Sequence, residues 1–166
     1  MENAEANLKL IEDGTINGRA ALEILQQSGR YVFHGSPNRL DMLEPRQAHQ
    51  HNSETGENIP DGEPAVFASE NFEQAIFKGL VSQSYNFGPG KRVSGWDGSS
   101  SKLHYYAQGD LLEKARLESS KAYVHVFLKG DFDYVRGSEH RAHKPVKPKF
   151  IVEVNGSDLP ENIESR

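Results

Sequence analysis

The chain has 166 residues and no cysteine, and its 24 acidic and 19 basic side chains give a formal net charge of −5. This length predicts a single core, the lack of cysteine excludes a disulfide scaffold, a zinc–thiolate site and a cysteine nucleophile, and the acidic balance disfavours nonspecific nucleic-acid binding. Apolar runs are short and the first residues are acidic, so we expect no signal peptide and no membrane span, and a soluble protein of the cytoplasm.

Residues 1–30 predict an N-terminal helical segment in two pieces. Asp13-Gly14 ends the first piece, and the second has an apolar face at helical spacing, formed by Ala20, Ala21, Ile24 and Leu25. Gly29 follows at a position where a helix end favours a left-handed residue. We expect these helices to pack against the rest of the domain.

Tyr31-Val32-Phe33 predicts a strand that brings His34-Gly35-Ser36 to its end, before Pro37. A ring nitrogen, an open glycine backbone and a hydroxyl then lie close together, which suits a polyhydroxylated ligand such as a ribose, or an amide-bearing ring. The alternative interpretation is that His34 only closes a turn between strand and loop.

Residues 38–64 are polar and rich in Gly, Pro, Asn and His. A segment this long without a clear pattern is typical of a lid or binding loop, or else of disorder. His49 and His51 lie within it, but without a third ligand they do not predict a metal site.

The chain returns to strand character at residues 65–68, and Ser69 is the expected N-cap of a helix that follows. Residues 88–101 are rich in Gly and Ser, without the spacing of a phosphate-binding loop. Trp96 in this segment is either a stacking residue or a packed anchor.

The last third predicts mostly strands, with one short helix over 110–118. The strands are expected at 103–106, 122–128, 131–135 and 150–154. The fold class is therefore α+β, with a mixed β-sheet core flanked by helices. We expect a helical segment at 1–30, one domain at 31–160 and a tail at 161–166. The stretch 136–149 is basic and contains one acid, Glu139, in a predicted loop, which leaves a local anion site open.

The combination of Tyr31-Val32-Phe33-His34-Gly35-Ser36, a long polar loop and Ala65-Val66-Phe67-Ala68-Ser69 before a helix resembles the ADP-ribosyltransferase superfamily, on its poly(ADP-ribose) polymerase and diphtheria-toxin side. The resemblance spans residues 31–154 and implies that family's sheet core. It also implies an NAD-dependent transferase that moves ADP-ribose to an unidentified acceptor, such as a protein. NAD is then a substrate, and no metal is needed.

The resemblance assigns roles to individual residues. His34, Gly35 and Ser36 match the motif that holds the nicotinamide-ribose end of NAD, and Phe67 matches the aromatic residue that stacks on nicotinamide. Ser69 joins the expected cofactor-binding residues. The family also uses a glutamate that polarises the ribose 2′-hydroxyl. No glutamate opens the final strand, so Glu139 or Glu153 must serve, and we favour Glu139 because basic neighbours keep it ionised.

Two alternatives belong to other classes of protein. The first is a catalytically inactive module that binds NAD, ADP-ribose or a protein partner. The second is an enzyme similar to RNA 2′-phosphotransferases, for which Arg141, His140 and His143 are the candidate residues. Nucleic acid is the less favoured partner because of the net charge of −5.

Overall fold

The computed structural model describes residues 2–51, 54–81, 94–99 and 102–165, and it has the α+β architecture that the sequence predicts. The four helices of the described residues are α1 (Glu2–Glu12), α2 (Gly18–Gln27), α3 (Phe72–Leu80) and α4 (Gly109–Ala115). The strands are β1 (Tyr31–Ser36), β2 (His49–His51), β3 (Asn58–Pro60), β4 (Val66–Ser69), β5 (Ser94–Ser99), β6 (Lys102–Ala107), β7 (Lys121–Leu128), β8 (Asp133–Arg136), β9 (Glu139–Ala142), β10 (Phe150–Asn155) and β11 (Ile163–Ser165).

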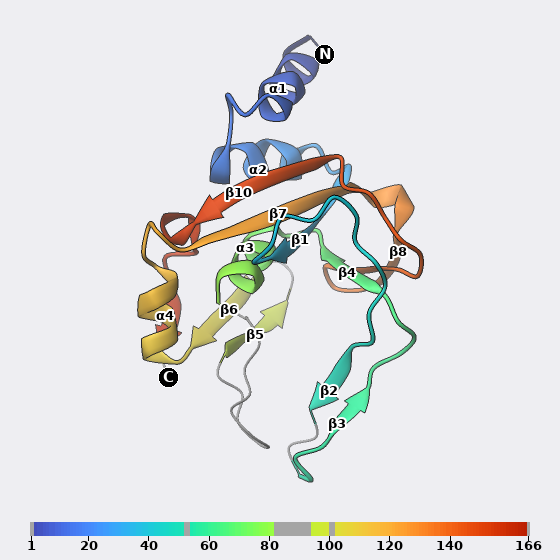
Figure 1. Cartoon of the computed structure of the whole chain (residues 1–166), viewed down its shortest axis with the longest axis vertical. Helices are drawn as coiled ribbons and strands as arrows, with labels where there is room; N and C mark the ends of the chain where they lie inside the picture. The colour runs from blue at the N-terminus through green and yellow to red at the C-terminus, as the bar shows by residue number, and fades with distance from the viewer. Residues whose placement is uncertain (1, 52–53, 82–93, 100–101, 166) are drawn as a thin grey trace.

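Six strands form the main sheet, in the order β10-β7-β1-β4-β9-β8 (Figure 1). Every registered pair of neighbours in it is antiparallel. A second sheet has the order β11-β6-β5, and β2 pairs with β3 in a hairpin that extends away from the main sheet (Figure 1). Two short 3-10 helices, Lys129–Asp131 and Gly156–Asp158, follow β7 and β10.

The main sheet is covered on both faces, as the alternation along β1 shows. Tyr31 and Phe33 pack with α2, α3 and α4 in the larger apolar cluster. Val32 points to the opposite face and packs in a smaller cluster, together with Leu43, Phe127, Phe132 and Val146. Because side chains alternate between the two faces of a strand, β1 is apolar throughout its first half and still contributes to two separate cores.

Helix α3 lies unusually close to β1, and Gly35 makes this possible. A Cβ atom on Gly35 would lie 1.8 Å from the carbonyl oxygen of Ala75 in α3. Gly79, one turn further along α3, is similarly confined, because a Cβ there would lie 2.9 Å from the Cβ of Ala122 in β7. The two glycines therefore set the distance between the helix and the sheet.

The structure corrects the predicted start of this helix. Ser69 is the last residue of β4, and the N-cap is Asn71, whose side chain accepts a hydrogen bond from the Glu73 backbone N–H at 2.9 Å. Both residue types favour an N-cap position. Ser69 stays in the strand because it pairs with Glu139 of β9, so the helix begins at Phe72.

Four other predicted segments are also corrected. Glu139 opens strand β9 and does not lie in a loop. The segment 38–64 contains the β2–β3 hairpin, and the expected tail contains β11, which pairs in parallel with β6. Residues 94–99 of the Gly-rich segment form β5, while 88–93 and 100–101 lie outside the described residues. No helix in the described part of the chain is long and apolar enough to cross a bilayer.

Candidate functional site

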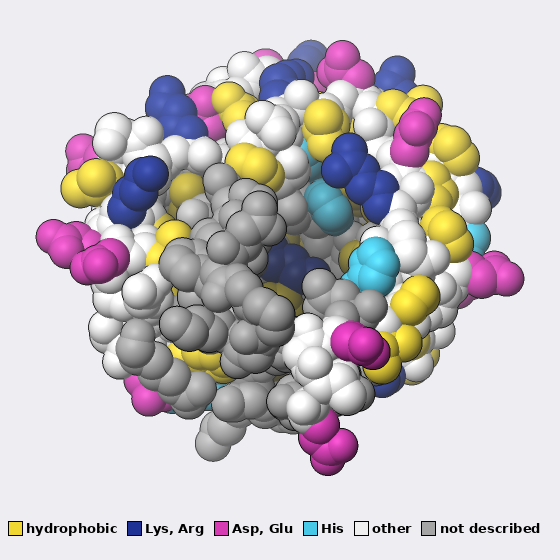
Figure 2. Space-filling model, turned by 60° about the horizontal axis from the view of Figure 1, so that its bottom comes forward, with side chains coloured by type: hydrophobic (Ala, Val, Ile, Leu, Met, Phe, Trp, Pro, Cys, Tyr) yellow, Lys and Arg dark blue, Asp and Glu magenta, His cyan; other side chains and the backbone are white. Residues whose placement is uncertain are grey.

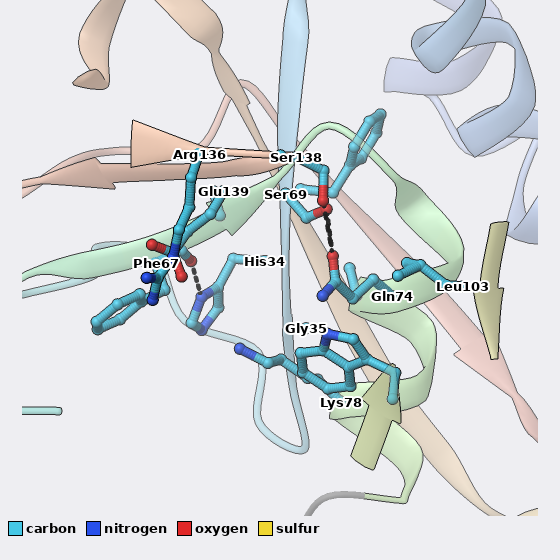
Figure 3. A pocket seen from close by; sticks show the side chains of 15 residues that line it. His34, Gly35, Phe67, Ser69, Gln74, Lys78, Leu103, Arg136, Ser138 and Glu139 are labelled. Carbon is cyan, nitrogen blue, oxygen red and sulfur yellow. Dashed lines mark hydrogen bonds between the residues drawn. The ribbon is translucent and has the colours of Figure 1, made fainter. Parts of the chain in front are cut away.

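A cavity of about 480 Å³ lies beside the C-terminal half of β1. Its walls come from β1, β4, α3, β5, β6 and the turn between β8 and β9 (Figure 3). This volume falls within the range of roughly 300–1,000 Å³ that is usual for small-molecule sites. In Figure 2 the forward face is hollowed near its centre, with basic and histidine side chains visible in and beside the hollow.

The cavity begins where β1 and β4 separate. The registered pairing of these two strands consists of Phe33 with Ser69, whereas β1 pairs with β7 along its whole length. Beyond Phe33 the sheet therefore opens between β1 and β4, and His34 and Gly35 line the opening. A break in sheet pairing thus creates the cavity.

The ring of His34 spans this opening. Its Nδ1 lies 2.6 Å from the carbonyl oxygen of Phe67, so Nδ1 carries the proton and donates it to that carbonyl. Loss of water around the ring lowers the pKa of His34 to about 4, against the opposing effect of the Phe67 bond. The ring is neutral at pH 7, and its Nε2 is a hydrogen-bond acceptor.

A second histidine supports the ring of His34 from the next strand. His125 pairs directly with His34 across β1 and β7, and the two ring centroids are 6.2 Å apart. His125 is fully buried, and its Nε2 accepts a hydrogen bond from the Leu40 backbone N–H at 2.9 Å. Burial lowers the pKa of His125, so this ring is neutral as well.

The register of β4 with β9 places the candidate glutamate in the cavity. Ser69 lies opposite Glu139, and Phe67 lies opposite Arg141. Residues two apart in a strand share a face, so all four side chains lie on the same side of the sheet. The Arg141 guanidinium stacks on the Phe67 ring at 4.6 Å and donates to the Glu139 carboxylate at 3.1 Å.

Gln74 of α3 joins two serine hydroxyls at one end of the cavity. Its Oε1 accepts hydrogen bonds from Ser69 Oγ at 2.6 Å and from Ser138 Oγ at 3.2 Å. Ser69 Oγ is free to donate because it already accepts from the Asn71 backbone N–H. With the amide oxygen occupied, the amide nitrogen of Gln74 points into the cavity (Figure 3).

Two cations also line the cavity, Lys78 and Arg136, and neither forms an ion pair with a described residue. The Lys78 amine lies 5.2 Å from the Trp96 ring centroid and points toward His34 (Figure 3). Loss of water around the amine lowers the pKa of Lys78, and the charge of Glu139 opposes this shift. Part of the Lys78 side chain remains exposed to solvent.

The structure brings most of the predicted site residues together. His34, Gly35, Phe67, Ser69 and Glu139 all line the cavity. All five come from three neighbouring strands, β1, β4 and β9. Gly35 also has a structural role, because its missing Cβ makes room for α3.

Other predicted residues lie elsewhere. Ser36 is buried outside the cavity, and its Oγ accepts from the Asn38 backbone N–H at 3.1 Å. Glu153 lies on β10, which is an edge of the sheet, and pairs with Lys121 at 3.9 Å. His140 is buried, and His143 Nδ1 bonds to the Pro64 carbonyl, so neither lines the cavity.

Gln74 and Lys78 line the cavity but are not among the site residues predicted from the sequence. They lie four residues apart in α3 and so share one face of the helix. Most of their neighbours in this helix are buried, including Ala75, Ile76 and Phe77. Two polar residues at helical spacing in such a helix are the signal that could have identified them.

Within the described residues, no three His, Asp or Glu side chains gather as metal ligands. No protein-family model, curated protein or solved structure matches the chain. The geometry and chemistry of the cavity are therefore the observations that bear on function.

Proposed function

We propose that this protein cleaves NAD at the nicotinamide–ribose bond and transfers the ADP-ribose to an acceptor. The observation that carries the proposal is the convergence of His34, Phe67 and Glu139, from three neighbouring strands, on one cavity. They are among the residues to which the resemblance to ADP-ribosyltransferases assigns roles, with Glu139 as the favoured one of two candidate glutamates, and they are 33 or more positions apart along the chain.

The groups in the cavity match the nicotinamide-ribose half of NAD. The neutral His34 offers Nε2 as an acceptor for a ribose hydroxyl. The Phe67 ring offers an aromatic surface to nicotinamide, and the Gln74 amide nitrogen offers a donor to a carbonyl or hydroxyl oxygen. Lys78 and Arg136 provide positive charge for the phosphates.

Glu139 is the group that would lower the barrier. When the glycosidic bond breaks, its electron pair leaves with nicotinamide and positive charge develops on the ribose. A fixed carboxylate beside the ribose stabilises this charge, as carboxylates do in enzymes that cleave sugar bonds. The acceptor nucleophile then forms a bond to the same carbon and loses its proton.

Release of nicotinamide from NAD tests the proposal. Purified protein is incubated with NAD, with and without a protein acceptor, and nicotinamide is quantified by chromatography. We expect release by the wild type and a loss on the order of 100-fold in His34→Ala and Glu139→Gln. Glu153→Gln is the matched control, because this glutamate is exposed and outside the cavity, and it should keep wild-type activity.

Other outcomes would replace the proposal. Absence of release, together with a rise in melting temperature on addition of NAD or ADP-ribose, would indicate a binding module. NAD consumption that requires 2′-phosphorylated RNA would indicate a phosphotransferase. A protein that neither releases nicotinamide nor binds NAD or ADP-ribose would contradict the assignment of this cavity to NAD.

A further inference from the structure

We propose that Arg141 is a positioning residue that orients the Glu139 carboxylate for the reaction and ties the cavity wall to the end of the β2–β3 hairpin segment. This inference rests on the proposed function. Arg141 does not line the cavity, and its side chain is only 10% exposed. Burial of a guanidinium costs free energy unless the group is fully paired, so the contacts of Arg141 indicate its role.

Both contacts of Arg141 with Glu139 go to the same oxygen atom. Nε donates to Oε2 at 3.1 Å, and Nη2 also lies 3.1 Å from Oε2. Among the described residues, Oε1 of Glu139 has no such partner. The arrangement therefore holds one carboxylate oxygen in place and leaves the other available to a ligand hydroxyl.

Arg141 also fixes the aromatic wall of the cavity. Phe67 lies directly opposite it in the β4–β9 register, and the guanidinium carbon lies 4.6 Å from the ring centroid. Stacking of a guanidinium on an aromatic face is favourable and restricts the orientation of both groups. One side chain thus sets the positions of two residues that the proposed reaction uses.

The third contact connects Arg141 to the segment after β3. Nη2 lies 3.3 Å from Oδ2 of Asp61. Gly62, with a φ of +70°, passes close to the guanidinium, and a Cβ there would lie 2.9 Å from Nη1. The chain therefore leaves space for the arginine at this point.

The charges of this group also suit the reaction. Arg141 contacts two carboxylates, those of Asp61 and Glu139. The group therefore keeps one net negative charge, because one guanidinium neutralises only one of the two carboxylate charges. Positive charge that develops on a ribose beside Glu139 would still meet a net negative group. A lysine in place of Arg141 could not make the paired contacts and the stack at the same time.

A double-mutant cycle tests this inference. The turnover number for nicotinamide release is measured for the wild type, Arg141→Met, Glu139→Gln and the double variant, and melting temperatures are recorded in parallel. We expect Arg141→Met to lower kcat by about 10-fold to 100-fold in the wild-type background, and to add almost no loss to Glu139→Gln. Arg141→Lys should retain part of the activity.

Additive losses in the cycle would contradict the proposal, because an arginine with only a structural role would reduce activity whether or not Glu139 is present. If Arg141→Met does not fold, Arg141→Lys decides, and a folded variant with wild-type kcat would overturn the proposal. Asp61→Asn keeps the contact between Arg141 and Glu139, so a loss of activity as large as that of Arg141→Met would also contradict the proposal.

A wild type that releases no nicotinamide would overturn the proposed function and this inference together, whereas an active wild type with unchanged arginine variants would overturn the inference alone.

Discussion

At the scale of single residues, His34 shows how one backbone contact determines the chemistry of a side chain. The Phe67 carbonyl can only accept a hydrogen bond, so it fixes the proton on Nδ1 and leaves Nε2 as an acceptor. Burial keeps the ring neutral by lowering its pKa to about 4. A protonated ring would lose this acceptor and place a positive charge beside Lys78, whose charge already disfavours protonation.

This pKa predicts a pH dependence of stability. His34 titrates near pH 6.5 when unfolded and near pH 4 when folded. Its contribution to the free energy of unfolding is therefore fully present above pH 6.5 and is lost progressively as the pH falls toward 4. The loss is at most about 3 kcal/mol, from the size of the shift. Urea unfolding at several pH values between 7 and 4 measures it.

His34→Gln provides the comparison for this measurement. The variant should lose less stability than the wild type between pH 6.5 and pH 4. Part of the dependence will remain in both proteins, because His125 also has a lowered pKa and contributes with the same sign. Equal pH dependence in the two proteins would show that His34 does not titrate with the predicted pKa.

At the scale of elements, the packing of α3 on β1 determines where the cavity lies. The helix carries Gln74 and Lys78, and the strand carries His34. Any increase in the distance between them would move the polar groups of the helix away from those of the strand. Gly35 controls this distance, because its missing Cβ lets the Ala75 carbonyl approach.

Gly35→Ala should therefore be strongly destabilising. The added methyl group would lie 1.8 Å from the Ala75 carbonyl oxygen, and backbone atoms on both sides would have to move. We expect a loss of about 3 kcal/mol or more, as for other severe overpacking in a core. Gly130→Ala is the matched control, because nothing lies within 4 Å of a Cβ at that position. Thermal or urea unfolding measures the free energy of unfolding of both variants. Similar stabilities for the two variants would contradict a tight contact between α3 and β1 at Gly35.

The sequence predicted individual elements better than their pairing. Strands β7 and β10 are rich in β-branched and aromatic residues, which local preference detects. The position of Glu139 depends on β9 pairing with β4, residues more than sixty positions away, and no local pattern in Glu139–Ala142 indicates that contact. The same pairing keeps Ser69 in a strand, although its sequence position also suits a helix cap.

At the scale of the whole molecule, the opening in the main sheet is the central feature. β1 is paired with β7 throughout but with β4 at one position, so the two halves of the sheet separate next to His34 and Gly35. Helix α3, the second sheet and the β8–β9 turn then surround the opening. The candidate site is thus a product of topology. Local motifs predicted His34 and Phe67 and left the glutamate open between Glu139 and Glu153, because the pairing of β4 with β9 has no local pattern.

The most direct measurement is a crystal structure of Glu139→Gln grown with NAD, since the substitution should slow turnover and preserve the dinucleotide. We expect intact NAD in the cavity, with its nicotinamide against Phe67 and a ribose hydroxyl within hydrogen-bond distance of His34 Nε2. NAD bound elsewhere, or a cavity that stays empty at saturating NAD, would contradict the proposed function.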